Sequence, residues 1–146
     1  MKVGIVGATG LVGQEMIRVL ESRQFPVSEL SLFASERSLG ERLTFRSQEL
    51  SVEVLDTQSF ASKKLDFVLF ATSAGLSAEY ADRAAESGAI VIDNSSHFRL
   101  FDDVPLIVPE VNPEAIYQSK QRGIIANPNC STIQMMVVLK PLHDIS

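Results

Sequence analysis

Short apolar runs alternate along this chain with segments whose apolar residues recur every three or four positions. The runs are brief and rich in β-branched residues, which predicts buried strands, whereas the longer period predicts amphipathic helices. In the helix predicted over Leu11–Glu21, we expect Val12, Met16, Val19 and Leu20 to form the buried face. The predicted strands are Lys2–Val6, Glu29–Ala34, Leu65–Thr72, Ala89–Asp93, Leu106–Val108 and Gly123–Ala126, with a small β pair at Arg42–Phe45 and Glu49–Leu55, and the other predicted helices are Leu76–Ser87 and Ser131–His143.

This alternation of strand and helix predicts an α/β fold with a doubly wound, mostly parallel sheet and helices on both of its faces. A length of 146 residues suits one domain. The sequence stops at "LKPLHDIS", where the pattern would normally supply a further strand. We therefore expect the chain to be a fragment of a longer protein.

Composition and charge narrow the class of partner. The chain is 45% hydrophobic and 21% charged, with a net charge of −5, so a basic surface for nucleic acid or for an anionic membrane is not expected. It has no apolar run of the roughly 18 residues that a membrane span needs, and no room for a signal peptide before the glycine-rich turn. Its single cysteine fits a reducing compartment. We expect a cytoplasmic protein and predict no metal site.

The segment "GATGLVG" lies between the first predicted strand and the first predicted helix, with glycines at Gly7, Gly10 and Gly13. In a dinucleotide-binding turn, such glycines permit the tight turn, the approach of a pyrophosphate, and close packing of helix on strand. The N–H groups at the start of the helix then face the phosphates. The spacing is GxxGxxG rather than the commoner GxGxxG, and the alternative is an ordinary strand-to-helix turn. The position of the motif favours a Rossmann-type NAD(P)-binding domain.

The segment "ASERSLGER" follows the second predicted strand, where cofactor preference is decided. An acidic residue there binds the ribose hydroxyls of NAD, whereas an arginine with hydroxyl donors suits the 2′-phosphate of NADP. Glu36 offers the first, and Arg37 with Ser35 and Ser38 offers the second. The balance favours NADP, and a solvated charged loop is the competing interpretation.

The only cysteine, Cys130, lies in "NPNCST", between a predicted strand and the last predicted helix. The partial positive charge at a helix N-terminus stabilises a thiolate, which is the nucleophilic form of the side chain. Asn127 and Asn129 can cap the helix or donate to an oxyanion, and Pro128 stiffens the approach. A buried structural cysteine is the alternative. Beside a nicotinamide cofactor, the thiol suggests interconversion of an aldehyde and an acyl derivative through a thioester.

Five segments together, "GATGLVG", "ASERSLG", "DNSSHFR", "VPEVN" and "NPNCST", resemble aspartate-β-semialdehyde dehydrogenases, in order and over the whole chain. The resemblance implies NADP-dependent interconversion of L-aspartyl 4-phosphate and L-aspartate 4-semialdehyde, in lysine, threonine, methionine and isoleucine biosynthesis. Two alternatives stay open. One is an N-acetyl-γ-glutamyl-phosphate reductase-like enzyme, although that family carries a different sequence around its cysteine; the other is a non-catalytic nucleotide-binding paralogue.

The resemblance also assigns residues. Cys130 matches the nucleophile, Asn129 a neighbour that orients the site, and Arg99 the arginine that binds phosphate. An ion pair of Arg99 with Asp102 or Asp103 is the alternative from the sequence alone. The residues matched to the cofactor site are Gly7, Thr9, Gly10, Leu11, Val12, Gly13, Ser35, Arg37, Ser38 and Ser73.

By the same resemblance, residues 1–146 are the dinucleotide-binding domain, and 127–146 begin the junction to a missing catalytic and dimerisation domain. The family's acid–base histidine would lie beyond residue 146. Because general acid–base catalysis typically contributes 10²–10⁴-fold, we expect this chain to bind NADP and react at Cys130 without full turnover. The partners implied for the full-length protein are a small-molecule substrate, inorganic phosphate and further copies of itself, as a homodimer or homotetramer.

Overall fold

The computed structural model describes residues 1–56 and 58–145, and its centre is a seven-stranded sheet in the order β3-β4-β2-β1-β5-β6-β7. Every pairing is parallel except that of β3 with β4. The strands are β1 Lys2–Val6, β2 Glu29–Ala34, β3 Arg42–Phe45, β4 Gln48–Val54, β5 Phe67–Phe70, β6 Ile90–Asp93 and β7 Ile124–Ala126. The helices are α1 Leu11–Ser22, α2 Ala74–Glu86 and α3 Cys130–Asp144, with 3₁₀ segments η1 Glu36–Ser38, η2 His97–Leu100 and η3 Pro113–Gln121. This arrangement confirms the predicted α/β, mostly parallel fold.

The two faces of the sheet carry separate cores. Ile17 of α1 packs with Ile5 and Leu32 on one face, while Ala81 of α2 packs with Val68 and other residues on the opposite face. The chain leaves β1 for β2 on one side and returns to β5 on the other, so the strand order reverses at β1. In open parallel sheets, ligands bind at the carboxyl ends of the strands beside such a reversal.

Helix α1 buries a different line of residues from the predicted one. Gly13 and Ile17 are its buried positions, whereas Val12 and Val19 are 45% and 39% exposed. The reason is that Gly13 lies against β1: a Cβ built there would be 2.2 Å from the carbonyl oxygen of Gly7. The expectation was therefore wrong for Val12 and Val19.

The strand predicted at Leu106–Val108 does not form. Only an isolated bridge pairs Leu106 with Ala126. The side-chain amide of Asn112 donates to the oxygen of Leu106, and its oxygen accepts from the N–H of Val108, both at 2.9 Å. Asn112 thus uses backbone groups that a ladder would have needed, and Pro105 and Pro109 flank the segment.

Other boundaries also differ from the predictions, most of them by one or two residues. Strand β5 covers Phe67–Phe70 rather than Leu65–Thr72, because the chain turns after Phe70 toward α2. Helix α2 begins two residues before its predicted start, since Ser73 caps it by accepting a hydrogen bond from the N–H of Leu76 at 3.4 Å.

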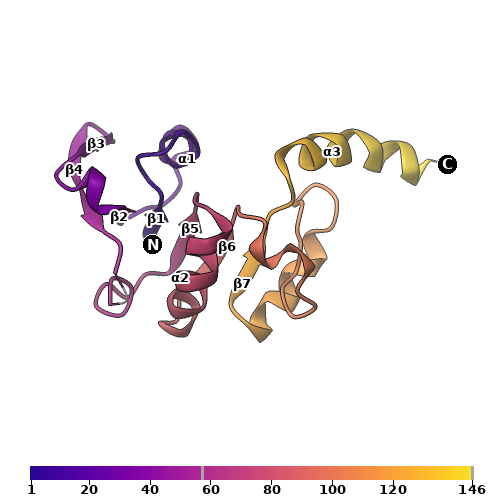
Figure 1. Cartoon of the computed structure of the whole chain (residues 1–146). Coiled ribbons are helices and arrows are strands. Elements are labelled where there is room, and N and C mark those ends of the chain that lie inside the picture. Colours follow the sequence, from indigo (N-terminus) through magenta and orange to yellow (C-terminus); the bar gives the residue numbers. More distant parts are fainter. Residues whose placement is uncertain (57, 146) are drawn as a thin grey trace.

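Helix α3 leaves the sheet directly after β7 and runs away from the rest of the chain (Figure 1). None of its described residues is buried, and the exposed apolar ones include Met135, Val138 and Leu142. Strand β7, by contrast, is buried at all three positions. The helix is therefore held to the sheet through the segment before it, where Asn127 bonds to Asp93 and Arg99.

Candidate functional site

The glycine turn between β1 and α1 is wedged between neighbouring strands. The N–H groups of Gly7 and Ala8 both donate to the carbonyl oxygen of Phe33 in β2, at 2.8 and 3.1 Å. On the other side, a Cβ on Gly7 would lie 2.3 Å from the oxygen of Ala71, and its φ of +83° is one that other residues rarely adopt. No side chain caps α1, so its first N–H groups are available to an anion.

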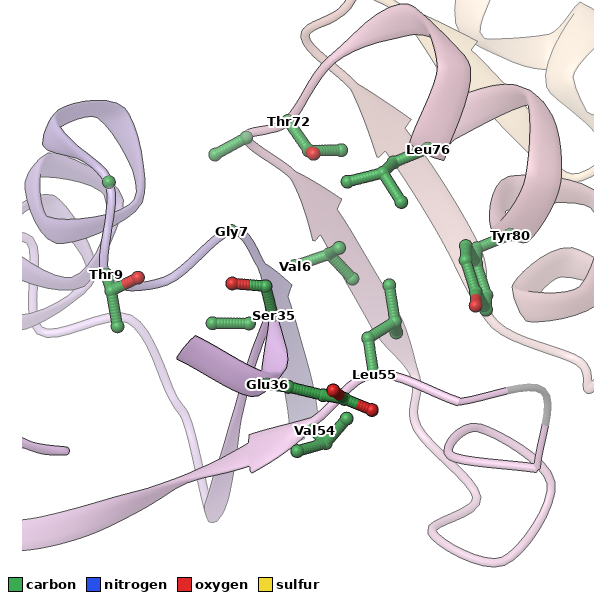
Figure 2. A pocket seen from close by; sticks show the side chains of 13 residues that line it. Val6, Gly7, Thr9, Ser35, Glu36, Val54, Leu55, Thr72, Leu76 and Tyr80 are labelled. Carbon is green, nitrogen blue, oxygen red and sulfur yellow. The ribbon is translucent and has the colours of Figure 1, made fainter. Parts of the chain in front are cut away.

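A cavity of about 400 Å³ opens beside this turn, within the usual size range of small-molecule sites. It lies at the carboxyl ends of β1, β2, β4 and β5, where the strand order reverses. Figure 2 shows Leu76 and Tyr80 of α2 on one side of it and Thr9 and Ser35 on the other. Its lining residues are Val6, Gly7, Thr9, Gly10, Ala34, Ser35, Glu36, Val54, Leu55, Ala71, Thr72, Leu76 and Tyr80.

The residues predicted for the cofactor site fall into two groups. Four of them line the cavity: Gly7, Thr9, Gly10 and Ser35. Six others do not line it: Leu11, Val12, Gly13, Arg37, Ser38 and Ser73. Their roles as cofactor ligands stay predictions.

Among that second group, Ser38 supports the wall, because its hydroxyl lies 3.1 Å from the hydroxyl of Thr9 and ties η1 to the glycine turn. Gly13 holds α1 close to β1, and Ser73 caps α2 beside Thr72. Arg37 is exposed and makes no hydrogen bond or ion pair within the described residues, so its guanidinium is available to a ligand.

One wall of the cavity was missed from the sequence. Leu55, Leu76 and Tyr80 make it largely apolar, as the flat face of a base requires. Burial raises the pKa of the Tyr80 phenol, and the neighbouring carboxylate of Glu79 adds to that effect. The sequence did hold one indication of this wall. Leu76 and Tyr80 are four residues apart, so they lie on the same face of the helix that follows the central strand β5. Glu36, considered as a ribose ligand, also lines the cavity.

The structure places Cys130 as the first residue of α3, with its side chain exposed. Asn129 caps the helix: its side-chain oxygen accepts from the N–H of Ser131 at 3.0 Å and lies 3.9 Å from the Cys130 sulfur. The alternative of a buried structural cysteine is therefore wrong. Since β7 is parallel to β1, Cys130 and the cavity both lie toward the carboxyl edge of the same sheet.

Arg99, on η2, bridges the two loops at this edge. Its Nε donates to the main-chain oxygen of Asn127 at 2.9 Å, and its Nη2 donates to that of Asn94 at 3.2 Å. The described residues show no ion pair of Arg99 with Asp102 or Asp103. Asp103 pairs instead with Arg122 at 3.1 Å. Within the described residues, the guanidinium of Arg99 therefore bonds to main-chain oxygens and has no carboxylate partner.

Arg122 links η2 to helix α2. Its guanidinium lies 5.2 Å from the ring centres of both Phe98 and Phe101 and forms a bidentate pair with Asp82 of α2. The hydrogen bond from Arg122, with its charge, holds the pKa of the Asp82 carboxyl below its usual value. The short helix that carries Arg99 is thus fastened to α2.

Comparison with known proteins assigns this arrangement to a family. The model of the semialdehyde dehydrogenase NAD binding domain matches residues 2–119. The chain belongs to the semialdehyde dehydrogenase family. The chain is 54% identical over 143 residues to aspartate-semialdehyde dehydrogenase of Aquifex aeolicus, covering 98% of the chain and 42% of that relative. It thus spans well under half the length of this curated relative.

Solved structures agree with that assignment. Aspartate semialdehyde dehydrogenase II of Vibrio cholerae, complexed with ASA, superposes with a TM-score of 0.93 at 53% identity, over 98% of this chain and 46% of that one. The Candida albicans aspartate semialdehyde dehydrogenase with NADP gives 0.80 at 30% identity, over the same shares of the two chains. The family and the NAD-binding fold inferred from the five sequence segments are therefore confirmed. In the part of the chain that the structure describes, no helix has the length and apolar character needed to cross a membrane.

Proposed function

We propose that this chain is the cofactor-binding and nucleophile-bearing part of an NADP-dependent aspartate-semialdehyde dehydrogenase. One observation carries the proposal: an exposed thiol at the start of a capped helix lies toward the same sheet edge as a nucleotide-sized cavity. A nucleotide-binding protein without catalysis has no need of a thiol in that position. Residues 127–146 would then begin the junction to a catalytic and dimerisation domain, in a cytoplasmic homodimer or homotetramer.

The residues of the cavity fit a dinucleotide. Gly7 and Gly10 line the cavity without side chains, and the N–H groups of α1 suit the pyrophosphate. The apolar wall of Leu55, Leu76 and Tyr80 suits a base. Arg37 supplies a fork of donors for the 2′-phosphate that distinguishes NADP from NAD. NADP, when bound here, would supply the hydride acceptor for oxidation of the aldehyde and, in its reduced form, the hydride donor for the reverse reaction.

The chemistry of the chain's own residues follows. In the oxidative direction, the sulfur of Cys130 adds to the aldehyde carbon of aspartate semialdehyde, and Asn129 holds the helix start that stabilises the thiolate. Once that carbon has lost its hydride, the acyl group remains on Cys130 as a thioester. A phosphate oxygen then attacks the thioester carbon, the C–S bond breaks, and aspartyl phosphate leaves the free thiolate. Arg99 binds the phosphate through its guanidinium.

Calorimetric titration of the chain with NADP⁺ and NAD⁺ tests the proposal, with Arg37→Ala as the variant. Arg23→Ala is the matched control, because Arg23 is an exposed arginine at the far end of α1. We expect NADP⁺ to bind more tightly than NAD⁺, and Arg37→Ala to weaken NADP⁺ by about tenfold, the value of one charge-assisted hydrogen bond. The control should change neither affinity.

Mass spectrometry after mixing with aspartate semialdehyde and NADP⁺ tests the nucleophile. An acyl adduct on Cys130, absent in Cys130→Ser, supports the thioester. NADP⁺ binding without any adduct would favour a non-catalytic nucleotide-binding protein. If a folded chain binds neither cofactor, the proposal fails.

A further inference from the structure

Asp93, the last residue of β6, is a fully buried carboxylate. Its Oδ1 accepts from the hydroxyl of Ser77 at 2.7 Å and from the N–H of Ser95 at 3.1 Å. Its Oδ2 accepts from the hydroxyl of Ser95 at 2.6 Å. The carboxylate thus joins the first turn of α2 to the loop that follows β6.

The partners of this carboxylate are neutral. In the described residues no lysine, arginine or histidine forms an ion pair with it, although a buried charge is costly unless it is well compensated. An asparagine or an apolar residue would fill the same volume at lower cost. A buried charge that is kept in this way suggests a task in orienting the groups around it.

The Ser95 hydroxyl connects Asp93 to the segment that carries Arg99. The hydroxyl of Ser95, held by Asp93, accepts from the N–H of His97 at 3.1 Å, where η2 begins. Arg99 lies two residues further along that segment. The main chain adds a second link, because the oxygen of Asp93 accepts from the N–H of Asn127 at 2.8 Å.

Asp93 therefore lies beneath both loops that Arg99 bridges. Arg99 donates to Asn94, which follows Asp93 directly, and to Asn127, which leads to Cys130. The side chains of Asn94 and Asn127 are themselves 3.4 Å apart. Movement of the Asp93 carboxylate would be transmitted to the guanidinium and to the start of the Asn127–Cys130 segment.

We propose that Asp93 is a positioning residue that, through Ser95, orients Arg99 toward an anion, phosphate, presented at Cys130. It touches neither substrate nor cofactor. The inference rests on the proposed function, since it takes Arg99 as the phosphate ligand. It assigns the buried charge to the phosphate site rather than to the stability of the sheet.

The test uses the reactivity of Cys130 in the 146-residue chain. Iodoacetate is an anion and iodoacetamide is neutral, so the ratio of their alkylation rates reports the positive charge presented to the sulfur. Inorganic phosphate should compete with iodoacetate at the same site. The variants are Asp93→Ala, Asp93→Asn, Ser95→Ala and Arg99→Ala, together with the double variant of Asp93 and Arg99. Ser119→Ala is the matched control, because it removes another buried serine hydroxyl, bonded to Ile116 in η3.

We expect Arg99→Ala and Asp93→Ala each to lower the ratio by about tenfold, at the low end for residues that orient a ligand group. The double variant should fall no further, because both changes remove the same oriented charge. Asp93→Asn should lower the ratio part of the way, since its one oxygen can still accept from Ser77 and from the N–H of Ser95 but no acceptor remains for the Ser95 hydroxyl at the Oδ2 position. Ser119→Ala should leave the ratio unchanged. A role in stability alone would alter both reagents' rates together and would leave their ratio and the phosphate competition intact.

Three results would overturn the inference: a normal ratio in Asp93→Ala, additive effects in the double variant, or no change in Arg99→Ala. If Asp93→Ala does not fold, Ser95→Ala decides, because it removes the hydroxyl that links Asp93 to His97. The affinity of the wild-type chain for NADP⁺, measured separately, shows whether the proposed function itself holds. Failure of cofactor binding and failure of Asp93 positioning are therefore distinguishable.

Discussion

Arg122 and Asp82 form a bidentate ion pair, with Nε 2.7 Å from Oδ1 and Nη2 2.8 Å from Oδ2. They are 40 residues apart in the sequence, and the pair joins the end of η3 to the middle of α2. The same guanidinium stacks on two phenylalanines of the segment that carries Arg99. One side chain thus holds three separate elements together.

We expect this pair to give the protein an acid-dependent stability. The carboxyl of Asp82 has a folded-state pKa below the usual 3.8, so the unfolded chain takes up its proton first as the pH falls. The stabilisation is complete above pH 3.8 and is lost as the pH drops through the lower, folded-state pKa. Because the side chain of Asp82 is 40% exposed, the stabilisation from this pair should be only about 1 kcal/mol.

Urea unfolding of the wild type and of Asp82→Asn, measured between neutral and acidic pH, checks this dependence. The two free-energy curves should converge at low pH. A constant gap over the whole range would contradict the expectation.

Gly13→Ala should damage the cofactor site through the backbone. The new Cβ would be 2.2 Å from the Gly7 oxygen and 2.7 Å from the Ala8 Cα, so α1 must move away from β1. We expect a loss of about 1–3 kcal/mol in unfolding free energy, together with weaker NADP⁺ binding. Gly75→Ala is the control: it lies in α2 with only the Ser73 hydroxyl at 4.0 Å, and should be neutral or slightly stabilising. Equal effects of the two substitutions would contradict this account.

Tyr80→Ala should weaken NADP⁺ and NAD⁺ by the same factor, about three- to tenfold for the loss of an aromatic wall. Its ring would pack against a base, which the two cofactors have in common. Tyr80→Phe keeps the ring and should bind as the wild type does. Calorimetric titration of both variants with both cofactors measures the factors. A selective loss of NADP⁺ would instead place the 2′-phosphate beside α2.

Asn129→Ala should loosen the start of α3 without lowering the stability of the sheet. The side chain accepts from the N–H of Ser131, and loss of such a cap costs about 1 kcal/mol. Hydrogen exchange at Ser131 should accelerate by about fivefold, while the urea midpoint of the chain stays unchanged. Asn129→Ser can retain the cap and should exchange more slowly than the alanine variant. A lowered midpoint in Asn129→Ala would show that α3 contributes to the global fold.

Local pattern was enough for most of the fold. Strand β2 was predicted with its observed bounds, because a β-branched or apolar run between turn residues has few other solutions. The exceptions depend on contacts between distant residues. The side chain of Asn112 bonds to the segment 106–108, which composition predicted to be a strand. The close approach of Gly13 to the Gly7 carbonyl places a different set of α1 residues against the sheet from the predicted set.

The candidate site divides in the same way. The glycine turn and the place of Cys130 at a helix start could be predicted, because each depends on neighbours within a few residues. The apolar wall could not be, since Leu55 and Tyr80 meet only after β4 and α2 have taken their places on the sheet. Nor could the partner of Asp103, because Arg122 reaches it from 19 residues away.

The exposure of helix α3 has a consequence for the rate at which its amides exchange hydrogen with solvent. It has 15 residues, none of them buried, and Pro141 interrupts its hydrogen bonding. A helix of that length is marginal in water without tertiary contacts, so its amides should exchange far faster than those of β7. The boundary between slow and fast exchange would then fall at Cys130. The thiol would keep its place at the sheet edge while the helix behind it opens and closes.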